Sequence, residues 1–164
     1  MKTSFSPQAY SAKSRRWLIG LGLPLLAFSI SASAELGGDV ASVQSDQARM
    51  KATVKVTEAQ AYTVQEITSP EGTVVKEFVS PAGKVFAVVW KGHFMPDLQQ
   101  LLGTYFVQFS QAAQSQQASH RARRVLSINE PGLVVQSAGR MRSYHGRAYV
   151  PEMIPQGVGP EVIQ

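Results

Sequence analysis

Cysteine does not occur among the 164 residues of the chain, and this absence excludes several kinds of chemistry. Without thiols the protein has no disulfides, thiolate zinc sites, iron–sulfur clusters or cysteine nucleophile, and no attachment point for a lipoprotein anchor. Its folded part must therefore be held together by an apolar core. A domain of about 130 residues buries roughly two thirds of its unfolded surface, which is sufficient without cross-links.

A long hydrophobic run is also missing. The longest candidate, Trp17–Ile30, has 14 residues, which as a helix reach only ~21 Å against a hydrocarbon core of ~30 Å. A basic segment ending in Arg15-Arg16 precedes this run, and the small residues 31–34 follow it. This order is typical of a secretory signal. We expect residues 1–34 to be a cleavable signal peptide, cut between Ala34 and Glu35.

The leader implies a location in the periplasm or outside the cell, because both destinations begin with this kind of segment. Arg15-Arg16 followed by Trp17-Leu18 also fits a twin-arginine export signal. Ordinary leader charge is the simpler interpretation, since no cofactor motif in the chain requires export in the folded state. Contact with a membrane is expected only through the leader, before its removal.

Excess charge of one sign is lacking once the leader is set aside. The whole chain has 16 basic and 11 acidic side chains, a net charge of +5. Four of the basic residues and none of the acidic ones lie in residues 1–34, which leaves 12 against 11, or +1. A nearly neutral domain has no general attraction for polyanions. Nucleic acid is therefore not an expected partner.

An internal repeat is the clearest positive signal. Residues 62–72 and 73–83 share five of 11 positions, and both end in Ser-Pro-x-Gly. Proline suits the second position of a type I turn, and glycine accepts positive φ at its close. With the apolar run Val85–Trp90, the repeat predicts a three-stranded antiparallel meander. The third strand is apolar on both faces, so we expect it to be central.

A single amphipathic helix should follow, with Pro96 in its first turn and Asp97 at its N-terminus. One apolar face recurs at helical spacing, and it should lie on the meander; its members are Leu98, Leu101, Leu102, Tyr105, Phe106 and Phe109. Residues 111–119 are either the end of this helix or a flexible connector.

Short strands are expected at 125–128, 133–137 and 141–144, with a turn at Asn129–Gly132, and His145-Gly146 marks either another turn or a break before 148–150. The fold class is α+β: an antiparallel meander with one helix packed on it, in the order β-β-β-α-β-β(-β). We expect a loosely held arm with at most one short helix at 35–60, a single domain at 61–151 and an irregular tail at 152–164.

Several segments together resemble a family of exported bacterial proteins catalogued as a domain of unknown function (DUF2844). They are Glu35–Gly38, the doubled repeat 62–83, Val85–Gly92, Met95–Leu98 with Leu101–Phe106, and Met141–Pro151. The resemblance covers nearly all of the chain after the leader. It implies a bacterial, exported protein, and it brings no activity, ligand or site residue with it.

Candidate catalytic and metal-binding residues are few. The histidines His93, His120 and His145 are 25 or more residues apart, unlike the short spacing of metal ligands, so we expect no metal site. A hydrolase would use Glu66 with Glu77, which the repeat places on neighbouring strands, or His93 with Asp97. The simpler interpretation makes Glu66 and Glu77 solvent-facing charges on the sheet. No G-x-S-x-G motif is present.

Two groups of residues suit binding. Aromatic and apolar residues between the central strand and the helix predict a small cleft or partner surface, or simply the end of the core; they are Trp90, His93, Phe94 and Met95. Arginines in the second half of the chain would bind a carboxylate or phosphate if the strands align them, and otherwise form a surface charge cluster; they are Arg121, Arg123, Arg124, Arg140, Arg142 and Arg147.

The function favoured from sequence is non-catalytic binding by an exported envelope domain, whose partner is another envelope protein or a small ligand. No cofactor is expected. The alternatives are an envelope hydrolase that uses the acid–base pairs above, and a structural or assembly factor that makes contacts through sheet edges.

Overall fold

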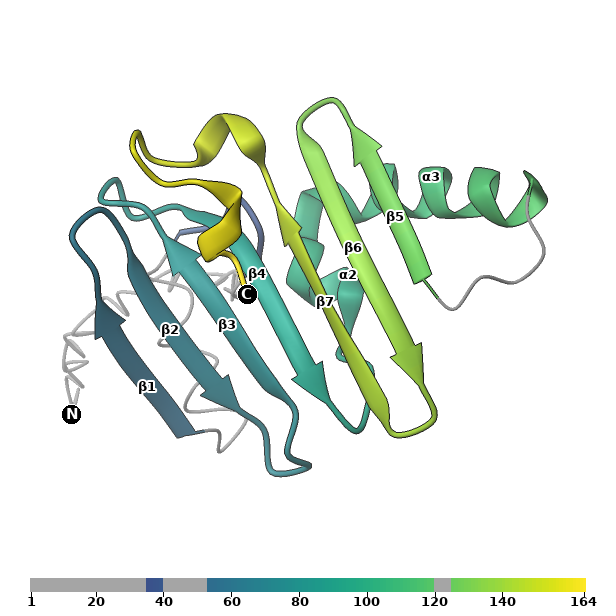
Figure 1. Cartoon of the computed structure of the whole chain (residues 1–164), viewed down its shortest axis with the longest axis horizontal. Coiled ribbons are helices and arrows are strands. Elements are labelled where there is room, and N and C mark those ends of the chain that lie inside the picture. The colour runs from purple at the N-terminus through teal and green to yellow at the C-terminus, as the bar shows by residue number, and fades with distance from the viewer. Residues whose placement is uncertain (1–34, 40–52, 120–124) are drawn as a thin grey trace, which may run out of the picture.

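A seven-stranded antiparallel sheet, in the order β1-β2-β3-β4-β7-β6-β5, is the frame of the protein (Figure 1). This computed structural model describes residues 35–39, 53–119 and 125–164. The strands are β1 (Thr53–Glu58), β2 (Thr63–Thr68), β3 (Val74–Val79), β4 (Val85–Gly92), β5 (Val125–Glu130), β6 (Leu133–Arg140) and β7 (Ser143–Tyr149). The α+β class is confirmed, with one more strand before the helical region than expected.

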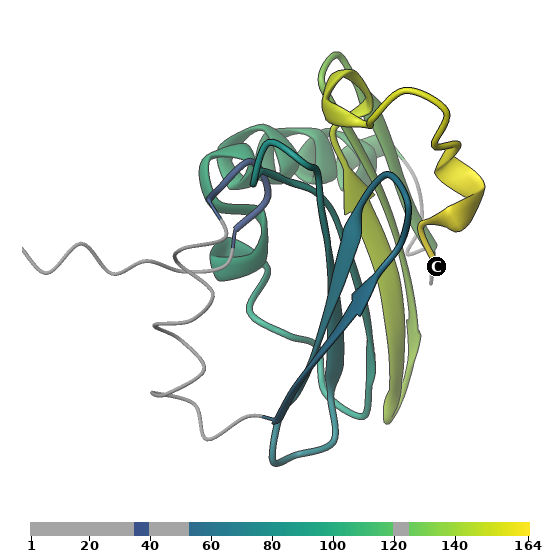
Figure 2. The ribbon, with the colours of Figure 1, turned by 90° about the vertical axis from the view of Figure 1, so that its left-hand side faces the viewer.

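The two faces of the sheet carry different covers (Figure 2). The first, here called the helical face, packs against α2 (Leu98–Leu102), a 3-10 turn η1 (Gly103–Tyr105) and α3 (Phe106–Ser119). The second, here called the C-terminal face, packs against the segment 150–164, which contains the 3-10 turns η2 (Pro151–Met153) and η3 (Pro160–Val162). The expected irregular tail is therefore a packed layer of the fold, with Ile163 fully buried.

The doubled Ser-Pro-x-Gly motif forms the two turns expected from it. Gly72 N–H donates to the Ser69 carbonyl at 2.9 Å, and Gly83 N–H donates to the Ser80 carbonyl at 2.9 Å. Both glycines have positive φ, 82° and 76°, a conformation that glycine adopts without a steric penalty. Each serine hydroxyl also accepts a backbone N–H, so the two hairpins close in the same way.

Strand β4 is central and buried on both faces, as its continuous apolar sequence predicts. Val85, Phe86, Ala87 and Val88 have no exposed surface. On one side β4 pairs with β3, and on the other it pairs with β7, near the end of the chain. This second pairing joins the meander β1–β4 to the meander β5–β7 in one sheet.

The expected single helix is divided in two at Gly103. Asp97 begins α2, and its carboxylate accepts the backbone N–H groups of Gln99 and Gln100 at 2.9 and 3.2 Å, as an N-cap residue does. Gly103 then adopts φ 52°, which ends α2 because a residue with positive φ cannot continue a right-handed helix. The chain turns through η1 into α3.

The predicted apolar face of the helical region does reach the core. Leu101, Leu102 and Phe109 are buried, and Leu98, Tyr105 and Phe106 pack beside them. Their neighbours lie on β4, β5, β6 and β7 rather than on the first meander alone. Residues 111–119 continue α3 to Ser119, so this tract is the end of the helix.

The turn or break expected at His145-Gly146 is wrong. Both residues lie inside β7, opposite Lys91 and Trp90 of β4. The chain turns instead at Met141-Arg142, where Arg142 has φ 61°. Gly146 fits in a strand here because the Trp90 ring packs against its Cα, where a side chain would collide with it. The turn before β6, at Pro131-Gly132, is as expected.

The segment 35–60 also differs from the loose arm expected. Residues 53–58 form the edge strand β1, which pairs with β2 along its whole length. Near the start, Leu36 is only 1% exposed, and its N–H donates to the Leu101 carbonyl at 2.9 Å. Residues 40–52 lie outside the described residues, as does the predicted signal peptide 1–34 with Ala34.

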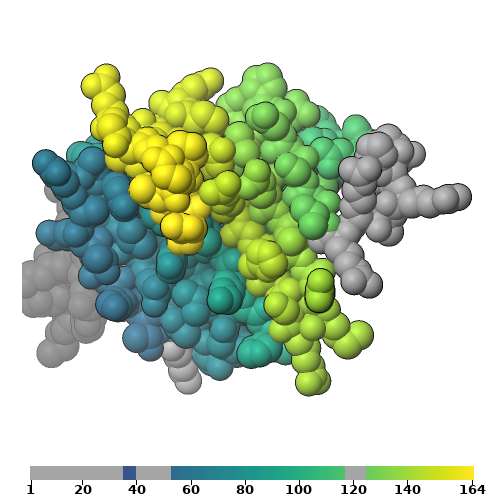
Figure 3. Space-filling view, viewed as in Figure 1, coloured from purple at the N-terminus to yellow at the C-terminus, as the bar shows by residue number. Residues whose placement is uncertain are grey.

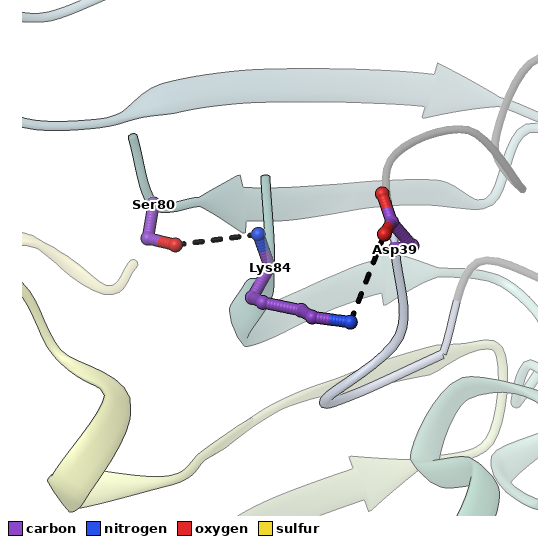
Figure 4. Close-up of polar contacts among 3 residues, drawn as sticks. All are labelled: Asp39, Ser80 and Lys84. Carbon is purple, nitrogen blue, oxygen red and sulfur yellow. Dashed lines mark hydrogen bonds and ion pairs between the residues drawn. The ribbon is translucent and has the colours of Figure 1, made fainter. Parts of the chain in front are cut away.

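Residues 35–39 are joined to the sheet at the start of β4. Asp39 forms a β-bridge with Lys84, and their side chains form an ion pair at 3.7 Å (Figure 4). The Lys84 N–H also donates to the Ser80 hydroxyl at 3.3 Å. Both members of the ion pair are about half exposed, so it contributes little free energy. The buried Leu36 side chain carries the attachment.

The role of Leu36 can be tested by truncation. Leu36→Ala is expected to lower the free energy of unfolding by about 2–5 kcal/mol, because it opens a cavity between α2 and the sheet. Val56→Ala, on the exposed edge strand β1, is the control and should change stability by under ~0.5 kcal/mol. Urea denaturation measures both. Equal small losses in the two variants would show that residues 35–39 are not part of the core.

Candidate functional site

Charge is divided between the two faces of the sheet. Strand residues alternate between faces, and the register assigns five Lys or Arg side chains and one carboxylate, Glu66, to the C-terminal face. The helical face receives the carboxylates Glu58, Glu77 and Glu130 and no Lys or Arg from the strands. The cations of the C-terminal face are Lys55, Lys76, Lys91, Arg140 and Arg147.

A groove of about 600 Å³ opens on this cationic side, beside the C-terminal segment. That segment covers one part of the C-terminal face and leaves the neighbouring part open (Figure 3). The groove lies over β4, β7 and β6, and reaches Val125 of β5. A second hollow of about 420 Å³ continues it toward Arg140 and shares Val125, Ala138 and His145 with it. None of the residues that line either hollow is Asp or Glu.

The register defines two rows of side chains that cross the groove. One row runs through Val74, Lys91, His145, Ala138 and Val125. Lys91 and His145 are direct cross-strand neighbours in it, so their Cβ atoms lie about 5 Å apart. Both side chains are exposed, and within the described residues neither forms an ion pair or hydrogen bond with protein.

The other row passes through Lys76, Val89, Arg147 and Gln136. Arg147 is engaged by the protein itself: Nε donates to Gln136 Oε1 at 2.9 Å, and Nη1 donates to the carbonyls of Pro160 and Ile163 at 3.2 and 3.1 Å. Lys76 Nζ donates to the Gln164 carbonyl at 3.3 Å. This row therefore holds the C-terminal segment on the sheet and forms one wall of the groove.

The two carboxylates predicted as a pair are separated by the sheet. Glu66 lies opposite Lys76 and Glu77 lies opposite Gln65, so the two side chains point to opposite faces. Glu77 is also fully buried, not solvent-facing as the simpler interpretation expected. Its burial is explained by its place on the helical face of a central strand. An acid–base pair made of these two residues is excluded by the register.

In the second predicted acid–base pair, His93 with Asp97, the aspartate has a structural role. Asp97 is the N-cap of α2, and its carboxylate accepts two backbone N–H groups. No hydrogen bond or ion pair joins it to His93 within the described residues. His93 is exposed in the loop that follows β4. Capping a helix is sufficient reason for an aspartate at this position.

The predicted aromatic surface is not one surface. Trp90 is 1% exposed on the helical face, where it belongs to the core, while Phe94 is 61% exposed in the loop beyond β4. His93 and Met95 are exposed in the same loop. The indole N–H of Trp90 has no acceptor among the described residues. The structure therefore places Trp90 apart from the three loop residues.

Three of the six predicted arginines lie in the described residues. Arg140 and Arg147 line the two connected hollows, while Arg142 is exposed in the β6–β7 turn. Arg121, Arg123 and Arg124 lie outside the described residues, as does His120. Sequence reasoning missed Lys91, Gln136 and His145, three further polar residues that line the larger hollow. Alternation along β4 and β7 was the signal that pointed to them.

Two further observations concern the described residues only. None of their helices has the length and apolar character needed to cross a membrane. Their His, Asp and Glu side chains form no cluster of three or more suited to a metal ion.

Comparison with known proteins agrees with the resemblance noted in the sequence. Residues 32–163 match the family described as "Protein of unknown function (DUF2844)", and the chain belongs to this family. No curated protein and no solved structure matches the chain.

Removal of Arg147 tests how the C-terminal segment is held. Arg147→Gln should weaken its attachment by about 1–3 kcal/mol, because the two hydrogen bonds to the Pro160 and Ile163 carbonyls lose their donor. Hydrogen exchange at Val162 and Ile163 should then become faster, while exchange in β6 stays slow. Arg140→Gln removes the same charge from the same face without these bonds and should leave exchange unchanged. Identical exchange in both variants would contradict the proposed attachment.

Proposed function

We propose that the protein is exported and that its folded domain acts by non-catalytic binding, with the groove on the C-terminal face as its binding site. Export is supported by the basic, apolar and small-residue order of residues 1–34. Binding is supported by the groove itself, whose volume of about 600 Å³ falls within the range of about 300–1,000 Å³ that is typical of small-molecule sites.

The observation that carries this proposal is the mixed character of the groove. Its floor is mainly apolar, with Val89, Ala138 and Ile163, and the exposed Lys91 and His145 stand beside that floor. Three paired strands hold four of these residues, and Ile163 is buried in the packed C-terminal segment, so the site needs no large rearrangement to form. An apolar surface with a few placed polar groups is the usual design of a ligand site.

A hydrolase receives no comparable support. The register separates Glu66 from Glu77, and the helix cap engages Asp97. General acid–base catalysis requires its two groups within hydrogen-bond reach of one substrate. The groove instead presents cationic and apolar groups, which suit recognition.

The test is native mass spectrometry of the protein purified from the envelope and culture fractions of the cells that produce it. We expect a mass that begins at Glu35 and carries a retained molecule. Ala138→Trp places an indole in the centre of the groove and should abolish retention. Thr57→Trp adds the same group on the same face at β1, away from the groove, and should leave retention intact; circular dichroism checks that both variants fold.

Each part of the proposal can fail separately. A mass that still includes residues 1–34 would contradict cleavage of the leader. A bare mass would contradict stable binding. A molecule retained equally by Ala138→Trp would show that the groove is not the site.

A further inference from the structure

We infer that the ligand of the groove is a single-chain amphipathic anion, a molecule with a compact carboxylate or phosphate head and one apolar chain. This inference rests on the proposed function and names the ligand class of the same site. It assigns the head to the Lys91–His145 pair and the chain to the apolar floor.

The head position follows from the charges around Lys91 and His145. Lys91 faces Val74 on β3, and His145 faces Ala138 on β6, so neither has an acidic cross-strand neighbour. Arg147 and Lys76 in the adjacent row are cationic too. An anion placed between Lys91 and His145 would accept a charge-assisted hydrogen bond from the ammonium and a second hydrogen bond from an imidazole N–H, in a part of the sheet whose other charged side chains are cations.

Glu66, the one carboxylate side chain that the strands place on this face, cannot play that part. Glu66 lies between Lys55 and Lys76, its direct cross-strand neighbours on β1 and β3. Its two cross-strand neighbours within the first three strands are therefore both cations. Lys91 and His145 lie on the next two strands, and among the described residues no Asp or Glu side chain faces them across the sheet or lines the groove.

The chain position follows from the residues beside the pair. Val89 and Ile163 lie at one end of the floor, Ala138 lies at its centre, and Val125 lies at the edge strand. From β4 to β5 the floor crosses three strand spacings, about 14 Å. One extended alkyl chain fits this narrow strip. Its burial supplies the hydrophobic part of the affinity.

An acidic peptide suits the groove less well. A peptide gains affinity on a sheet by pairing its backbone with a free edge. Most of the floor of the groove lies on β4, β7 and β6, which are paired on both sides, and only Val125 at its end belongs to the edge strand β5. A peptide that crossed these strands would leave its own N–H and C=O groups without ladder partners. A ligand with one polar end and an apolar remainder avoids this cost.

Calorimetric titration with decanoate, decanol, acetate and decyl phosphate tests the inference on protein purified as the cell processes it. We expect decanoate and decyl phosphate to bind at least tenfold more tightly than decanol, and acetate to bind at least a hundredfold more weakly than decanoate. A preference between decanoate and decyl phosphate identifies the head as carboxylate or phosphate. All probes are used below the concentration at which they form micelles.

The double variant Lys91→Gln/His145→Gln should weaken decanoate binding about tenfold to a hundredfold, as expected for the loss of hydrogen bonds to a charged group. Decanol binding should not change. The control Lys55→Gln removes a cation from the same face outside the groove and should leave both affinities unchanged.

Three outcomes would overturn the inference. Equal binding of decanoate and decanol would make the groove a purely apolar site. Unchanged decanoate binding in the double variant would place the anion elsewhere. A neutral molecule or a protein retained in a manner sensitive to Ala138→Trp would contradict the ligand class while leaving the proposed binding function in place.

Discussion

The pairing of β4 with β7 is the contact on which the rest of the structure depends. β4 ends the first meander and β7 ends the second, and only this ladder joins them into one sheet. The buried side chains of β4 on both faces make it the hydrophobic centre of the fold. The same ladder sets Lys91 beside His145, so the contact that unites the fold also creates the groove.

A central strand that is apolar on both faces requires a cover on each side, because exposed apolar surface is costly. The helical region and Leu36 cover one face, and the C-terminal segment covers the other. This last cover is short, and its polar contacts with the sheet include two hydrogen bonds from Arg147 and one from Lys76. Since it spans only part of the face, the remaining apolar strip stays open beside Lys91 and His145.

Local features were predictable from the sequence where one residue type dictates one conformation. The two Ser-Pro-x-Gly turns, the Asp97 cap and the buried β4 all belong to this group. The length of the 11-residue repeat also bears on which faces of the sheet its two glutamates occupy. In the β2–β3 hairpin, even-numbered residues pair with even-numbered residues, and paired residues point to the same face of the sheet. Two residues 11 positions apart, one even and one odd, therefore lie on opposite faces, which is why Glu66 and Glu77 do not meet. The roles of Gly103 and Gly146 could not be predicted from local pattern, since glycine is equally compatible with a helix break, a close contact inside a strand and a turn.

The sequence by itself determined the α+β class, the first hairpins and the absence of thiol chemistry, because these depend on local pattern and composition. It also marked Arg140 and Arg147 as candidate anion-binding residues. Only the tertiary structure decided that β7 inserts beside β4, that Trp90 belongs to the core, and that Lys91 and His145 line the groove. Cross-strand neighbours distant in sequence are chosen by the burial of whole faces, and no local pattern encodes that choice.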